Sequence, residues 1–180
     1  LDTDGDHDAA AFDASNLNLL RVENTGTSWN LRVTVGLPAG IARAVAGDLG
    51  GDARDELLFL GGGLVEVVSV ADFDFSDVRP RSSSPHGAAA FGDFDGDGNG
   101  DAMVSSGSRV ELWRGDGSTN ITMGASVDLG AAITDLATVA TAIRPGVAVL
   151  GGGEVQIVSS TGGVDLATRG PCLRQTLATL

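Results

Sequence analysis

Residues 60–69 read Leu-Gly-Gly-Gly-Leu-Val-Glu-Val-Val-Ser, and residues 150–159 read Leu-Gly-Gly-Gly-Glu-Val-Gln-Ile-Val-Ser. The two stretches lie 90 residues apart, and midway between them residues 105–113 read Ser-Ser-Gly-Ser-Arg-Val-Glu-Leu-Trp. Apolar residues recur at the same positions in all three stretches. Leu20 and Val22 occupy the matching positions 45 residues before Val65 and Val67. A fixed period is the signature of a repeat architecture. The offset of 45 residues therefore divides the 180-residue chain into four repeats.

The runs between the glycines have the length and composition of β-strands. In the second repeat they are Ile41–Ala46, Leu57–Leu60, Val65–Val70 and about Phe73–Val78. Their β-branched residues favour strands over helices, and Gly triplets suit tight turns. A unit of about 45 residues with four antiparallel strands is typical of a β-propeller blade. A solenoid is the alternative, although its repeats are usually shorter or helical. The sequence predicts an all-β fold, with residues 1–180 forming a single β-propeller domain of four blades.

The sharpest motif is residues 93–101, Asp-Phe-Asp-Gly-Asp-Gly-Asn-Gly-Asp. Alternate residues of a curled loop point inward, the glycine at position 6 permits the sharp turn, and hard oxygen ligands suit Ca²⁺ rather than Zn²⁺. An EF-hand would need Glu at position 12, where Val104 stands, and flanking helices, whereas the flanking residues resemble strands. We therefore predict a calcium loop in a β-hairpin. Its candidate ligands are the carboxylates at positions 1, 3, 5 and 9 and the backbone carbonyl at position 7: Asp93, Asp95, Asp97, Asp101 and Asn99.

Three further stretches lie at or close to the same offset, and each departs from this pattern of ligand positions. In residues 48–56, Gly50 replaces the acid at position 3, and the candidate ligands are Asp48, Asp52, Arg54 (position 7) and Glu56. Near residues 2–10, position 9 is not acidic. Asp8 can substitute for the missing acid if the loop is shifted by one residue, so the candidate ligands are Asp2, Asp4, Asp6 and Asp8. Residues 138–146 contain no acid. We expect that blade to be metal-free and held by apolar packing and Pro145.

Residues 90–101, Ala-Phe-Gly-Asp-Phe-Asp-Gly-Asp-Gly-Asn-Gly-Asp, resemble the FG-GAP (VCBS-type) repeat of the integrin α-subunit β-propeller and its bacterial relatives. Partial copies of this motif recur with the same period over about residues 1–165. The resemblance implies a propeller whose Ca²⁺ loops join strands 1 and 2 of each blade on one face, while the opposite face commonly binds partners. Gly50 and the acid-free fourth repeat depart from the family pattern.

The two ends of the chain bear on how a ring of blades closes. The first repeat begins at its metal loop and so lacks a first strand, whereas residues 175–180 fall where a further first strand is due. We predict that this C-terminal strand runs beside Leu1 and Asp2 and completes blade 1, because unpaired sheet edges invite aggregation. The alternative is self-association, or a longer parent chain, that forms a larger ring.

Composition narrows the possible functions. A net charge of −13 gives no electrostatic reason to bind nucleic acid or anionic lipid, and no apolar run is long enough for membrane insertion. The sequence has no nucleophile-elbow motif, and its carboxylates have the spacing of cation ligands, so we expect no enzyme activity. Calcium sites of this kind work best outside the cytosol, which favours a secreted or cell-surface protein.

The loops opposite the calcium loops are the expected binding face. They carry residues 61–63, 105–108 and 151–153 and a polar loop, in which Arg79, Arg81 and His86 are candidate contacts for an acidic or sugar ligand. Trp29 and Trp113 are candidates for stacking on sugars or for packing. We expect an adhesion or protein-interaction module. The alternatives are a lectin-like carbohydrate binder and a non-catalytic propeller within a larger secreted protein.

Overall fold

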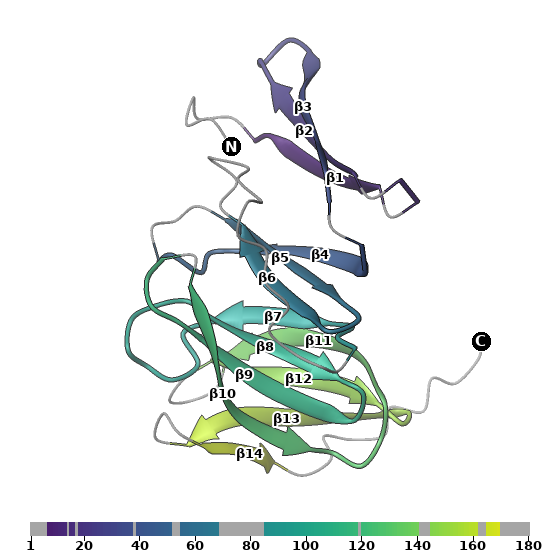
Figure 1. The fold of residues 1–180 in the computed structure, drawn as a ribbon. Helices are drawn as coiled ribbons and strands as arrows, with labels where there is room; N and C mark the ends of the chain where they lie inside the picture. The colour runs from purple at the N-terminus through teal and green to yellow at the C-terminus, as the bar shows by residue number, and fades with distance from the viewer. Residues whose placement is uncertain are drawn as a thin grey trace, which may run out of the picture.

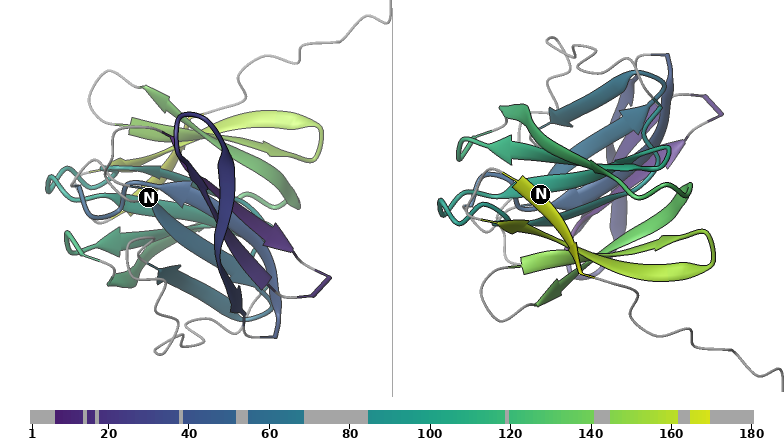
Figure 2. Two further views of the ribbon diagram at one scale, coloured as in Figure 1. Left: turned by 90° about the horizontal axis from the view of Figure 1, so that it is seen from above. Right: turned by 90° about the horizontal axis from the view of Figure 1, so that it is seen from below.

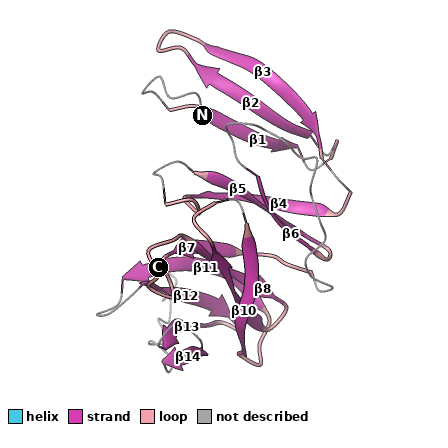
Figure 3. Cartoon of the chain, turned by 60° about the vertical axis from the view of Figure 1, so that its left-hand side comes forward, coloured by secondary structure: helices cyan, strands magenta, loops and turns pink. Residues whose placement is uncertain are grey.

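The computed structural model describes residues 7–13, 15–16, 18–37, 39–51, 55–68, 85–118, 120–140, 145–161 and 165–169. In these residues the regular structure is entirely β, which confirms the all-β prediction (Figure 3). The described part of the chain contains no helix long and apolar enough to cross a membrane.

The strands form four separate antiparallel sheets in chain order (Figure 1). The first sheet contains β1 (Ala9–Asp13), β2 (Asn18–Asn24) and β3 (Trp29–Gly36). The second contains β4 (Ile41–Gly47), β5 (Glu56–Gly61) and β6 (Leu64–Val68). The third contains β7 (Ala89–Gly92), β8 (Asp101–Ser106), β9 (Arg109–Gly115) and β10 (Ile121–Asp128). The fourth contains β11 (Ile133–Ala140), β12 (Pro145–Gly151), β13 (Glu154–Thr161) and β14 (Asp165–Arg169). The run expected near residues 73–78 lies outside the described residues.

The period of 45 residues recurs in the register of the central hairpins. Gly61 pairs with Leu64, Ser106 with Arg109, and Gly151 with Glu154, each pair 45 residues after the previous one. Each hairpin turns on two residues, with positive φ values at Gly63, Gly107, Gly152 and Gly153. Because side chains alternate between faces along a strand, a shared register places equivalent residues on equivalent faces.

The sheets pack face to face, and each interface has its own apolar core. The first and second sheets share a cluster around Leu19 and Phe59, and the second and third share one around Leu58 and Trp113. The third and fourth share a cluster that includes Met103, Val110, Leu112, Val147, Val149 and Val158. The core therefore runs through the molecule as three layers between four sheets (Figure 1).

The first strands of the second, third and fourth sheets, β4, β7 and β11, lie close to one another. The side-chain hydroxyl of Thr138 on β11 donates to the Phe91 carbonyl on β7 at 2.7 Å. An Arg43 guanidinium nitrogen on β4 lies 3.7 Å from an Asp135 carboxylate oxygen on β11. Sheets that stack in parallel lie about 10 Å apart, so a second and a fourth sheet would be about 20 Å apart. This ion pair requires the sheets to fan out from a common inner edge.

The first sheet packs with the opposite face from the one that the repeat predicts. Val65 and Val67 face the following sheet, so Leu20 and Val22 should do the same, but the residue buried against the second sheet is Leu19. Leu19 pairs with Phe12, whose ring meets Phe59 edge to face at 6.4 Å. Phe12 and Leu19 therefore face the second sheet, and Leu20 and Val22 lie on the other side of the first sheet.

No closed ring is seen in the described residues. The first sheet lies at one end of the molecule and the fourth toward the other (Figure 1), and in the view from above the first sheet lies in front of the others (Figure 2). Residues 175–180 and Leu1–Asp2, whose pairing was expected to complete blade 1, lie outside the described residues. Closure by the C-terminal strand therefore stays a prediction.

Candidate metal centre

The acidic loop between β7 and β8 brings three carboxylates together. Asp93, Asp95 and Asp101 each place a carboxylate oxygen within 4.8 Å of the others, a group that could hold a metal ion. Asp93 follows β7, and Asp101 is the first residue of β8. The two ends of the loop thus meet at the mouth of a hairpin whose register pairs Gly92 with Asp101.

The loop is curled by hydrogen bonds from its own backbone. The Gly96 amide donates to Asp93 Oδ1 at 2.6 Å, and the Gly98 amide donates to Asp93 Oδ2 at 3.2 Å. Gly96 and Gly98 have φ values of 81° and 93°, a region that other residues rarely adopt. Two glycines in the left-handed region therefore allow the chain to wrap around the Asp93 carboxylate.

Asp101 forms the floor of the site. Its side chain is fully buried and accepts three backbone amides: Phe94 at 2.9 Å and Asp95 at 3.1 Å on one oxygen, and Gly115 at 3.1 Å on the other. Burial raises the pKa of the Asp101 carboxyl to about 6, against the lowering effect of these hydrogen bonds. A bound cation would favour the ionised form that burial disfavours.

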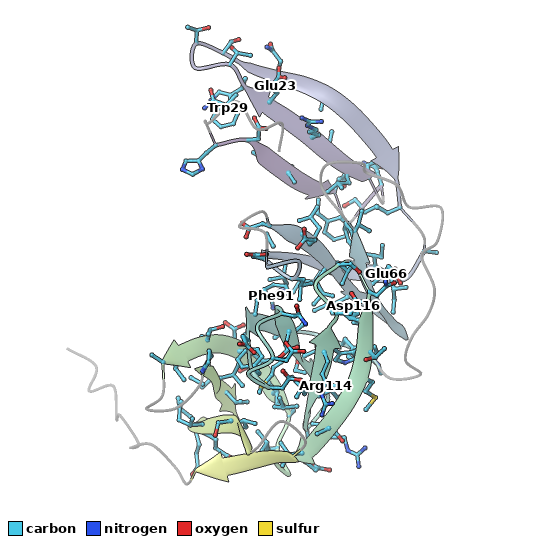
Figure 4. All side chains as sticks on the ribbon, turned by 90° about the vertical axis from the view of Figure 1, so that its left-hand side faces the viewer. Glu23, Trp29, Glu66, Phe91, Arg114 and Asp116 are labelled. Carbon is cyan, nitrogen blue, oxygen red and sulfur yellow. The ribbon has the colours of Figure 1, made fainter. Side chains whose placement is uncertain are left out.

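The rim of the site carries the remaining predicted ligands and one cation. Asp97 is exposed, and its carboxylate accepts the Asn99 amide at 2.8 Å rather than joining the cluster of three. Asn99 is half-buried. Arg114 Nε on β9 lies 3.5 Å from Asp95 Oδ2 and offsets part of the negative charge (Figure 4). Sequence spacing could not have identified Arg114, because strand pairing brings it to the loop.

The second loop repeats this architecture with one acid fewer. The Glu56 carboxylate accepts the Leu49 amide at 2.8 Å and the Gly50 amide at 2.9 Å, as Asp101 accepts those of Phe94 and Asp95. Asp48 Oδ1 accepts the Gly51 amide at 2.7 Å, as Asp93 accepts that of Gly96. Asp52 and Arg54, the other two predicted ligands, lie outside the described residues.

The first and fourth loops are described only in part. Asp2, Asp4 and Asp6 lie outside the described residues, as do residues 141–144 of the fourth repeat. Asp8 accepts the Asn24 amide at 2.8 Å, a hydrogen bond that lowers the pKa of Asp8. This contact resembles the one from Gly115 to Asp101. In the fourth repeat, Pro145 begins β12 and packs beside Gly92.

The second and third loops lie side by side at one end of their sheets. A Cβ on Gly100 would come within 2.3 Å of the Asp48 carbonyl oxygen, and a Cβ on Gly115 within 2.0 Å of the Gly100 carbonyl oxygen. Such distances are below any real contact, so these backbones approach as closely as glycine allows. A cation in the third loop would therefore brace two neighbouring sheets.

At the opposite end of the sheets, the structure corrects the expectation for His86. We expected it on a surface loop as a ligand contact, but its side chain is fully buried and its Nε2 lies 3.0 Å from Glu111 Oε2. Glu111 Oε2 also accepts the Trp113 indole N–H at 3.1 Å, and the His86 hydrogen bond lowers the pKa of Glu111. Trp113 is buried, whereas Trp29 is 59% exposed. Arg79 and Arg81 lie outside the described residues.

The alternation of the strand did not predict this buried polar cluster. Glu111 stands between Val110 and Leu112, so the pattern places its carboxylate on the opposite, solvent-facing side of β9. Glu111 is buried because the third sheet is covered on both faces, by the second sheet and by the fourth. A buried carboxylate needs hydrogen-bond donors. The sequence cannot tell which donors, since His86 reaches Glu111 across 25 residues.

The sequence matches no protein-family model and no curated protein. The resemblance to FG-GAP repeats therefore depends on the quoted residues alone.

Proposed function

We propose that the chain is a calcium-stabilised β-propeller module, secreted or displayed at the cell surface, that acts in adhesion or protein interaction. One observation carries the calcium part of this proposal: Asp93, Asp95 and Asp101 hold carboxylate oxygens within 4.8 Å of one another at the open end of a hairpin. The proposal gives the chain no catalytic step.

The chemistry of the donors favours Ca²⁺ among common cations. The loop offers oxygen ligands only, and residues 93–101 contain neither His nor Cys. Calcium accepts six to eight oxygens in flexible geometry, whereas magnesium demands a compact octahedron. A curled loop with carboxylates on alternate residues suits the more permissive ion.

A structural role follows from what the loop connects. It joins β7 to β8, and Gly100 presses against the second loop at Asp48. An ion that binds only the folded loop stabilises the folded state by mass action. In the second loop, Glu56 and Asp48 repeat the backbone contacts of the third, which supports a second, weaker site there.

The fan of sheets supports the propeller architecture. The ion pair between Arg43 and Asp135 joins strands of the second and fourth sheets, and Thr138 bonds to β7 in between. In a propeller the first strand of each blade lies nearest the axis, so contacts of this kind are expected there. The four sheets are then four blades, and the fan is an arc of the ring.

The interaction role is proposed for the face opposite the calcium loops, with a protein ligand as the first candidate. Loops on a rigid scaffold are where binding commonly resides. A glycan ligand is the second candidate; the exposed ring of Trp29 suits stacking on a sugar, although Trp29 pairs with Asn24 near Asp8 and so lies at the calcium-loop end of the first sheet. The third is a non-catalytic part of a larger secreted protein.

Calorimetric titration of chelator-treated protein with CaCl₂ tests the calcium site. We expect binding to the wild-type protein and at least about tenfold weaker binding to an Asp93→Asn variant, because one of three charged ligands is lost. Asp55→Asn is the matched control, since Asp55 is exposed and outside the cluster. Equal affinities of the Asp93→Asn variant and the wild-type protein, or tighter binding of Mg²⁺ than of Ca²⁺, would contradict the proposal.

A further inference from the structure

Arg114 brings a positive charge to the acidic loop from a neighbouring strand. It stands near the end of β9, where it pairs with Thr122 on β10 (Figure 4). Its Nε lies 3.5 Å from Asp95 Oδ2. The Asp95 side chain is 10% exposed and the Arg114 side chain is 33% exposed, so water and salt screen this pair less than they screen a pair on the open surface.

A β-bulge in β10 leaves space for this side chain. The pairing of β10 with β9 shifts between Met123 and Ser126, and Gly124 lies in that interval. A Cβ on Gly124 would come within 3.0 Å of Arg114 Nε, which is closer than Cβ atoms normally approach. The glycine of the bulge therefore lets the arginine side chain lie across β10 beside the acidic loop.

The repeat pattern links Arg114 to the acid that it contacts. Asp95 stands at loop position 3 of the third repeat. In the second and fourth repeats, small uncharged residues stand at both corresponding positions: Gly50 with Ser69, and Ala140 with Ser159. The first repeat has Asp4 with Asn24, and Asp4 lies outside the described residues. In the second, third and fourth repeats, the arginine is thus present only where loop position 3 is acidic.

The charge of this cluster is partly balanced within the chain. Three carboxylates with oxygens within 4.8 Å of one another repel each other, and one guanidinium beside them leaves a formal charge of −2. We propose that Arg114 is a built-in counter-ion of the acidic loop, which stabilises the metal-free loop and lowers its affinity for calcium. The calcium part rests on the function proposed above, whereas the part about the metal-free loop does not.

The counter-ion also bears on which ions the loop accepts. A cation bound by Asp95 would be repelled by the guanidinium that contacts the same carboxylate. This repulsion is proportional to the charge of the ion, so it is about 1.5 times as large for a trivalent ion as for a divalent ion. Arg114 therefore favours divalent over trivalent ions at this site.

Calorimetric titration with CaCl₂ tests the effect of Arg114 on binding. We expect Arg114→Gln to bind calcium at least about fivefold more tightly than the wild-type protein, because a positive charge close to a doubly charged ion is removed. Arg114→Lys keeps the charge and should stay close to the wild-type affinity. Arg109→Gln is the matched control, since Arg109 lies at the other end of β9, 57% exposed at its side chain and 3.8 Å from Asp128. It should bind calcium like the wild-type protein.

Titration with LaCl₃ separates the charge of Arg114 from a role in shaping the loop. La³⁺ also prefers oxygen ligands. Arg114→Gln should gain more affinity for La³⁺ than for Ca²⁺, because the lost repulsion is larger for the trivalent ion. A variant that had only lost the shape of the loop would bind both ions more weakly, and that result would overturn the proposal.

Thermal unfolding in excess chelator tests the metal-free loop separately from calcium. Arg114→Gln should melt about 1–4 °C below the wild-type protein, and this difference should shrink in an Asp95→Asn background, where the contacted charge is absent. Arg109→Gln should melt like the wild-type protein.

Two results would overturn the proposal: equal melting temperatures of Arg114→Gln and Arg109→Gln in chelator, or calcium binding by Arg114→Gln that is no tighter than that of the wild-type protein. A wild-type protein that binds no calcium would contradict the proposed function instead. The melting temperatures in chelator would then decide the role of Arg114 by themselves.

Discussion

Replacing Asp95 by asparagine should have opposite effects on stability with and without calcium. Unit charges 4.8 Å apart repel by about 3.5 kcal/mol at an effective dielectric constant of about 20. The substitution removes two of the three repulsive pairs and keeps an oxygen for the Asp97 amide, which Asp95 accepts at 3.1 Å. It also removes the contact with Arg114, 33% exposed at its side chain, which is worth at most about 1 kcal/mol.

In excess chelator, the Asp95→Asn variant should therefore be at least as stable as the wild-type protein. At a calcium concentration about 100 times the dissociation constant, the wild-type protein should gain about 2.7 kcal/mol. For a chain of this size, that gain raises the melting temperature by about 5–10 °C. The variant should gain less than half of this, because it has lost a charged ligand.

Differential scanning calorimetry measures the melting temperatures of the wild-type protein and of the Asp95→Asn variant, each in chelator and in calcium. The order of stability should reverse between the two conditions, while an Asp55→Asn control follows the wild-type protein in both. Equal calcium-induced shifts in the wild-type protein and the Asp95→Asn variant, or no shift in either, would refute the assignment of Asp95 as a ligand.

Three further predictions concern Asp101, His86 and Gly100. The native pKa of Asp101 is about 6 and lies above its usual value of 3.8, so the metal-free native state holds this proton more tightly than the unfolded chain. The free energy of unfolding in chelator should therefore fall by about 2–3 kcal/mol between pH 4 and pH 7, and urea titrations with no loss over this range would contradict the burial of Asp101. His86→Ala should destabilise the protein by about 2–4 kcal/mol, since it leaves a cavity and removes a donor from buried Glu111; a change below about 1 kcal/mol in urea unfolding would show that the cluster is not buried. Gly100→Ala should be strongly destabilising, by about 2 kcal/mol or more, because its Cβ would meet the Asp48 carbonyl oxygen. Gly62→Ala, whose Cβ would have open space, is the control for Gly100→Ala, and equal thermal stability of these two variants would argue against the close approach of the loops.

The strands and their spacing could be predicted from the sequence because they depend on local patterns. Short β-branched runs between glycines set the hairpins, and Ile41–Ala46 and Leu57–Leu60 lie within β4 and β5. The ends of the acidic loop were also predictable, because Asp93 and Asp101 flank a hairpin whose register brings them together.

The parts that could not be predicted depend on packing between distant residues. The Asp101 side chain is buried beside Phe94 and accepts the Gly115 amide, and neither the loop motif nor its spacing predicts that burial. Asp97 fits the ligand spacing, yet its carboxylate bonds to the Asn99 amide on the exposed side of the loop. Leu19 rather than Leu20 turns inward, on the side where Phe12 meets Phe59 of the next sheet, a contact that the repeat pattern does not report.

Every strand pair in the four sheets joins neighbours in the chain. Short loops close at little entropic cost, so each hairpin can form early and independently, and folding of this kind is fast for an all-β protein. The long-range contacts, such as Arg43 with Asp135, then form only after whole sheets exist. A chain organised in this way can gain or lose a sheet by duplication or deletion of one 45-residue segment without disturbing the pairing of the others.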